Sequence, residues 1–188
     1  MDIGTHWITL VSIIIGLGVA DLLVNLHRLI HARASVAWDP LPLVWATIAL
    51  CWLFNYWWAV GAGLDGASNA RVVGHFVLLA INPIILFLLS ASILPRSLPA
   101  EGRLDMRVEW SSNRQTCFAL FALNQAVTWC VVIAARGGIF WDLPSVTRTA
   151  TLALVTLAFF SRSRTYEWFA AVTIFVMMVA RLSMQEVR

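Results

Sequence analysis

The sequence predicts an all-α polytopic membrane protein, a bundle of six transmembrane helices in a single integral membrane domain over residues 1–188. Three observations predict this class. The chain is 60% hydrophobic with a mean hydropathy of +0.80. Charged residues make up 12%, about half the share usual in a soluble domain. The longest polar stretch, about 95–115, is too short to build a core of its own.

Six apolar segments approach the length that a helix needs to cross a bilayer. They cover about 7–30, 41–62, 72–94, 115–135, 144–161 and 165–182. The second segment begins where Asp39 precedes Pro40, an N-cap followed by a first-turn proline. The third contains Pro83, which should kink the helix because it donates no backbone hydrogen bond.

The last three segments carry similar boundary signals. Ser112 and Gln115 have the spacing of a capping box at the start of the fourth. The fifth follows Asp142, with Pro144 in its first turn. The fifth and sixth are short, so a re-entrant hairpin is the alternative to two separate spans there.

Similar sequences precede the second and fifth segments: Trp-Asp-Pro at 38–40 and Trp-Asp-Leu-Pro at 141–144. If spans one to three and four to six were repeats, the two halves would have inverted orientations, as in many transporters. The alternative is that an interfacial tryptophan, a capping aspartate and a first-turn proline recur wherever a helix enters a bilayer.

All 13 basic residues are arginine, and their placement predicts the orientation. Eight lie in the loops after spans one, three and five, and the other five lie on the opposite side. The positive-inside rule therefore puts the odd-numbered loops in the cytoplasm and both termini outside. Arginine without lysine is typical of some bacterial genomes, so we expect the inner membrane. No basic face with interleaved aromatics exists, so no nucleic-acid partner is expected.

On a helical wheel, span one has three faces. A bulky aliphatic face should meet lipid; it holds Ile8, Val11, Ile15, Val19, Leu22, Leu26 and Leu29. A ridge of small residues, which lets another backbone approach closely, consists of Ser12, Gly16 and Ala20. The polar face consists of Gly18, Asp21, Asn25 and Arg28.

Asp21 is the most informative residue of this polar face. A carboxylate within a span costs roughly 2.5–3.5 kcal/mol on insertion scales, so Asp21 should face protein or water. One interpretation makes it an ion or proton site. The other is structural: Asn25 and Arg28 reach the headgroups, and an arginine or a proton neutralises Asp21. Both stay open on the sequence alone.

Uncharged amides occur in spans two to four, at Asn55, Asn82, Asn124 and Gln125. Together with the polar face of span one, they could line a polar track across the bilayer. Asn82 stands directly before Pro83, which should leave a carbonyl free near mid-depth. The alternative is that each amide bonds a neighbouring helix and holds the bundle together, at about 0.6–2 kcal/mol.

Metal or cofactor chemistry finds little support. His27 and His31 lie one helical turn apart and form a candidate metal pair, but the predicted topology brings no third ligand near them. The motifs of zinc proteases, serine hydrolases and phosphate-binding loops do not occur. We therefore expect no catalytic residues and no cofactor, and a membrane enzyme stays open only if a bound cofactor is found.

Two functions remain. The first is a small channel or transporter for an ion, protons or a small solute, homo-oligomeric through the small-residue ridge. The second is a non-transporting sensor or accessory subunit that binds a protein partner through the cytoplasmic loop 95–114. Arg148 and Glu167 receive no role, and Arg162 or Arg164 is the expected ion-pair partner of Glu167.

Overall fold

The structure, a computed structural model, describes residues 3–64, 76–99, 102–136, 138 and 141–185. Its α-helices are α1 (Ile3–His31), α2 (Pro40–Leu64), α4 (Phe76–Ile93), α5 (Met106–Arg136), α6 (Leu143–Phe160) and α7 (Arg164–Gln185). A short 3-10 turn, η1 (Arg33–Ser35), follows α1. Two short strands, β1 (Val36–Ala37) and β2 (Leu104–Asp105), pair in parallel. The predicted all-α class is confirmed.

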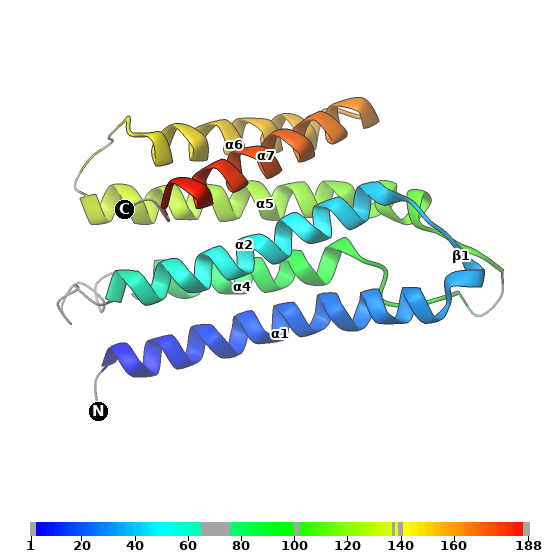
Figure 1. Cartoon of the computed structure of the whole chain (residues 1–188), viewed down its shortest axis with the longest axis horizontal. Coiled ribbons are helices and arrows are strands. Elements are labelled where there is room, and N and C mark those ends of the chain that lie inside the picture. The colour runs from blue at the N-terminus through cyan, green and yellow to red at the C-terminus, as the bar shows by residue number, and fades with distance from the viewer. Residues whose placement is uncertain (1–2, 65–75, 100–101, 137, 139–140, 186–188) are drawn as a thin grey trace.

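The helices run back and forth along one long axis, so that the beginning of α1 and the end of α7 lie at the same end of the bundle (Figure 1). We call this the terminal end, and the opposite end, where β1 lies, the strand end. Helix α4 packs against α1, α2 and α5, while α6 packs against α5 and α7. Helices α2 and α7 also touch, so the two halves of the chain share one bundle.

Four of the described helical segments are long and apolar enough to cross a membrane, which indicates a membrane protein. They are His6–His31, Pro40–Gly61, Met106–Ala134 and Leu143–Phe160. They overlap the first, second, fourth and fifth predicted spans. The capping box expected at Ser112 and Gln115 is wrong, because α5 begins at Met106 and Ser112 lies inside the helix, where its Oγ donates to the backbone oxygen of Glu109. In α4 the apolar segment within the described residues is Ala80–Ile93, which is shorter, and the predicted third span begins outside those residues. The six-span bundle and the inverted repeats stay predictions.

The expectation that the bulky face of α1 meets lipid is wrong for all of that face except Ile8, which is 36% exposed. Val11, Ile15, Leu22 and Leu29 are each at most 4% exposed and pack in the core. The close helix approach occurs at Gly18, where an added Cβ would lie 3.1 Å from Ser90 Oγ. The helical wheel did not predict this packing because a bundle core and lipid are equally apolar. The size of the side chains therefore does not indicate which of the two a helix face meets.

The small-residue ridge makes little contact within the chain. Gly16 and Ala20 are exposed, and a Cβ added at Gly16 would meet nothing within 4 Å. At the terminal end of the ridge, Ser12 Oγ accepts a hydrogen bond from Trp57 Nε1 at 3.0 Å. The ridge is therefore no tight intrachain interface at Gly16, and its role between copies of the chain stays a prediction.

Candidate functional site

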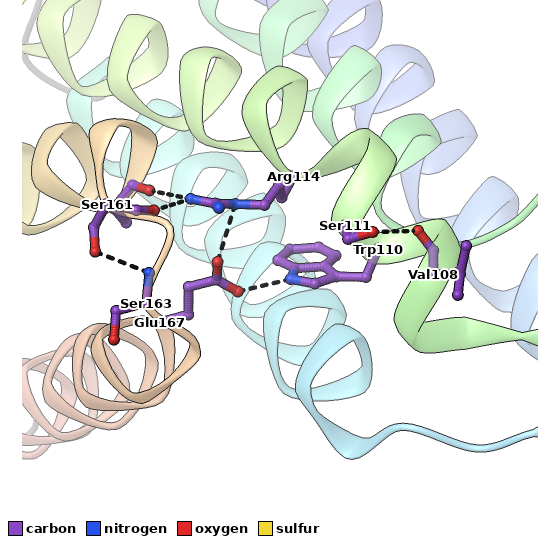
Figure 2. A network of polar contacts seen from close by, with 8 residues as sticks. Val108, Trp110, Ser111, Arg114, Ser161, Ser163 and Glu167 are labelled. Carbon is purple, nitrogen blue, oxygen red and sulfur yellow. Dashed lines mark hydrogen bonds and ion pairs between the residues drawn. The ribbon is translucent and has the colours of Figure 1, made fainter.

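A buried ion pair joins α5 to α7 at the strand end (Figure 2). Glu167, in the first turn of α7, is 4% exposed. Its Oε1 lies 3.0 Å from Arg114 Nε, and its Oε2 accepts a hydrogen bond from Trp110 Nε1 at 2.8 Å. Trp110 and Arg114 are four residues apart on α5, so one helix face supplies both partners.

Arg114 also holds the end of α6. Its Nη2 donates to the backbone oxygen of Ala158 at 2.9 Å and to that of Ser161 (Figure 2). The last carbonyls of a helix have no intrahelical donor and carry partial negative charge, so a cation there is favourable. One guanidinium thus ties together α5, the end of α6 and the start of α7.

The expected partner for Glu167, Arg162 or Arg164, is wrong. Arg164 pairs with buried Asp39, with Nη2 and Oδ1 2.5 Å apart, and Arg162 is exposed. Asp39 Oδ1 also accepts the backbone N–H of Leu41, as its predicted N-cap position requires. The expectation relied on closeness in sequence. Glu167 instead points towards α5, where Arg114 and Trp110 lie.

A second polar group joins α4 and α5 within the bundle. Asn124 Nδ2 donates to Asn82 Oδ1 at 3.1 Å, and Asn82 Nδ2 donates to Thr128 Oγ1 at 3.1 Å. Thr128 in turn donates to the backbone oxygen of Asn124. Asn82 and Asn124 are 2% and 3% exposed. These contacts match the structural interpretation, in which amides hold neighbouring helices together.

The polar face of α1 forms a third group. Asn25 Nδ2 donates to Asp21 Oδ2 at 3.0 Å; Asn25 is buried and Asp21 half-buried. Arg28 is exposed, and its Nη1 donates to the backbone oxygen of Arg96 at 3.3 Å. In the part of the chain that the structure describes, no arginine forms an ion pair with Asp21.

A pocket lies among α2, α5, α6 and α7, and it contains two of the predicted site residues. Its lining residues are Trp52, Asn55, Gln125, Thr147, Arg148, Thr151, Ile174, Met177 and Met178. The space open to the centres of water-sized molecules is about 40 Å³. At roughly 10–15 Å³ for each water, this space holds about three waters or a solute of similar size.

Gln125 is one of the polar residues that line this pocket. Its side chain is 4% exposed, and it makes no hydrogen bond to any residue that the structure describes. Its amide atoms are not fully enclosed by protein, so they can bond water or a polar solute in the pocket. The lining offers amides, hydroxyls and one guanidinium, and none of its residues is a carboxylate.

The rings of the two histidines on α1 lie close together. The rings of His27 and His31 lie 4.9 Å apart, and both side chains are exposed. Within the described ranges, no group of three histidine, cysteine or acidic side chains is placed to hold a metal ion.

Three partners of these polar groups escaped the sequence analysis: Trp110, Arg114 and Thr128. A signal existed for the first two, because Glu167 lies just inside an apolar segment, and a charge at that depth needs a partner from another helix. Thr128 gave no signal, since threonine is common on membrane helices.

The chain was also compared with known proteins. It matches no protein-family model, no curated protein and no solved structure. The strand-end network and the Asn82–Asn124 pair are internally bonded, whereas Gln125 faces a space that a ligand can enter.

Proposed function

We propose that this protein is a channel or transporter for a small polar solute or ion, and that the pocket around Gln125 is where the solute binds. One observation carries the proposal: a buried amide lines a pocket and has no hydrogen-bond partner among the described residues. Sites at the interface of membrane helices, lined by apolar residues and a few polar groups, are typical of carriers.

Helix α5 connects the pocket with the rest of the polar track. Asn124 and Gln125 are consecutive residues, so they point to different sides of α5. Asn124 bonds Asn82 of α4, while Gln125 faces the pocket that also contains Asn55. The Asp21–Asn25 pair supplies a further polar group on α1. In this proposal α5 forms the wall shared by both parts of the route.

The proposal includes a membrane arrangement. All six helices cross the bacterial inner membrane, the strand end lies in the cytoplasm, and both termini lie outside. In this proposal helices α1, α2 and α4 form one three-helix repeat and α5, α6 and α7 the inverted second, with the same order of apolar segments and a Trp-Asp sequence before the middle one. Copies of the chain associate through the exposed ridge at Gly16 and Ala20.

Flux into liposomes tests the proposal. The purified full chain is reconstituted, and entry of chloride, potassium, protons and urea is measured against empty liposomes. We expect at least one of these to enter faster with protein. Gln125→Leu should slow that entry about tenfold, because the loss of hydrogen bonds worth about 1.4 kcal/mol corresponds to that factor.

Gln115→Leu is the matched control, because Gln115 is exposed on the same helix outside the pocket. It should leave the flux unchanged. Asp21→Asn tests the track: a reduced flux makes the charge of Asp21 part of the route. Absence of flux for all four probes, with intact helical structure, would refute transport of these species.

The second candidate function is a sensor or accessory subunit that binds a protein partner through the segment 95–114. A surface pocket of about 350 Å³ at the strand end favours it. Its lining residues are Ser97, Pro99, Arg103, Leu104, Asp105, Val108 and Glu109. Absence of flux in the liposome experiment would favour this function over transport.

A further inference from the structure

Two exposed arginines meet where the ends of α1 and α4 lie side by side. Arg28 is in the last turn of α1, and Arg96 follows the end of α4. Arg28 Nη1 donates to the backbone oxygen of Arg96 at 3.3 Å, and both side chains are exposed. The contact uses only the backbone of Arg96, so its guanidinium is not engaged by Arg28.

These arginines differ from the buried arginines of the strand end. Arg114 and Arg164 pair with Glu167 and Asp39, respectively. Neither Arg28 nor Arg96 forms an ion pair with any acidic residue that the structure describes. The exposed rings of His27 and His31 lie within one turn of Arg28 on the same helix. Asp21 lies on the same face of α1 two turns before Arg28, where it is half-buried and bonded to Asn25. The two exposed guanidinium groups therefore keep an excess of positive charge at this end of α1, which favours an anionic ligand.

An apolar surface leads away from Arg28 along the same side of α1. Val24 precedes Arg28 by four residues and Leu17 precedes Val24 by seven, so all three lie on one stripe of the helix. Half-buried Asp21 lies at the inner edge of this stripe, where it bonds buried Asn25. Leu17 and Val24 are 56% and 48% exposed. A ligand that fits this surface has an anionic head near Arg28 and an apolar chain along the helix.

We propose that Arg28 and Arg96 bind the phosphate of an anionic phospholipid, whose acyl chain lies along Val24 and Leu17. Guanidinium groups bind phosphate oxygens with paired, charge-assisted hydrogen bonds. Inorganic phosphate shares that chemistry, but the apolar stripe favours the lipid. Each arginine near an anionic headgroup should strengthen binding about fivefold. This proposal is independent of solute transport, because it concerns the outer surface of α1 and α4.

Native mass spectrometry of the purified full chain in detergent tests the site. The probes are dioleoylphosphatidylglycerol, dioleoylphosphatidylcholine and inorganic phosphate. The test variant is Arg28→Gln/Arg96→Gln. The matched control is Arg107→Gln/Arg162→Gln, which removes the same charge from two other exposed arginines in the strand-end segments. Should the double test variant fail to fold, Arg96→Gln alone replaces it, because it keeps the backbone oxygen that Arg28 bonds.

We expect the native chain to prefer the phosphatidylglycerol over the phosphatidylcholine. The test variant should bind the anionic lipid roughly 25-fold more weakly, or about fivefold for Arg96→Gln alone, while the control keeps native affinity. An equal loss in test and control would overturn the proposal, because diffuse charge would then explain the binding. Displacement of the lipid by inorganic phosphate at similar concentration would also overturn it, in favour of a simple phosphate site.

Discussion

Arg114 and Glu167 form an ion pair of 3.0 Å between α5 and α7, with both side chains nearly excluded from solvent. The same carboxylate accepts a hydrogen bond from Trp110, and the same guanidinium binds the carbonyls that end α6. Three helices of the second half of the chain therefore depend on one buried charge pair. A pair of this kind holds the helices in one arrangement, and its members are costly to remove singly.

Arg114→Met should lower the free energy of unfolding by about 3–5 kcal/mol, because it leaves Glu167 buried and unpaired. The double variant Arg114→Met/Glu167→Met should be more stable than the single one, because no charge is then left uncompensated. Arg162→Met, at an exposed position, should change stability by no more than about 0.5 kcal/mol. Denaturant unfolding in detergent measures all three. Equal stability of Arg114→Met and Arg162→Met would contradict the role of the pair.

The hydrogen bond between Asn82 and Asn124 should appear as an energetic coupling. In a double-mutant cycle with alanine at both positions, we expect about 0.6–1.7 kcal/mol, the range typical of polar contacts between membrane helices. Asn25→Ala combined with Asn82→Ala is the control, because Asn25 bonds Asp21. That pair should be additive within about 0.3–0.5 kcal/mol. A coupling near zero for Asn82 and Asn124 would mean that the amides do not hold the helices together.

The periodicity and boundary signals of the sequence predicted much of the fold. Apolar length located the helices, and the capping roles of Asp39 and Asp142 mark true helix starts, with Asp142 accepting from the backbone of Ser145. These features are local, because a cap acts within its own first turn. The packing of α1 was not predictable in this way. Its aliphatic face could turn to lipid or to neighbouring helices at similar cost, and only the other helices decide.

For the polar residues, too, the sequence predicted one part and not the other. The list of intramembrane amides could be read from the sequence, since each is conspicuous in an apolar segment. Their pairing could not: Asn124 bonds Asn82, whereas its neighbour Gln125 lines a separate pocket together with Asn55. Which neighbouring helix each of these α5 side chains meets depends on how α4 and α6 pack around α5. The same dependence hid the pair of Arg114 with Glu167.

A larger side chain should lower the stability of the bundle at Gly18 but not at Gly16. A Cβ at Gly18 would lie 3.1 Å from Ser90 Oγ and 3.3 Å from Leu53 Cδ2, so Gly18→Leu should destabilise the bundle by about 1–3 kcal/mol. A Cβ at Gly16 would meet nothing within 4 Å, so Gly16→Leu should leave the stability of the single chain unchanged. Thermal unfolding in detergent, with the protein dilute enough to be monomeric, compares the two. A greater loss at Gly16 would contradict the observed packing.

The same Gly16→Leu variant tests whether copies of the chain associate through the exposed ridge. If Gly16 and Ala20 lie between copies, a leucine at Gly16 separates the backbones and should shift the chain to a lower oligomeric state. Light scattering coupled to gel filtration in detergent measures the mass. Leu10→Ala, at another exposed position of α1, is the control and should leave the mass unchanged. An oligomer that survives Gly16→Leu would place the interface elsewhere.

All six helices should cross the membrane, with the strand end in the cytoplasm and both termini outside. Alkaline phosphatase is active only outside the cytoplasm, where its disulfides form. Fused after Ser97 or after Ser163, both at the strand end, it should be inactive, because the arginine-rich loops stay inside. Fused after Gln185, at the end of α7, it should be active. Equal activity after Ser163 and Gln185 would show that α7 does not cross. Activity after Ser97 with none after Gln185 would reverse the orientation, because the two ends of the bundle would then have exchanged sides.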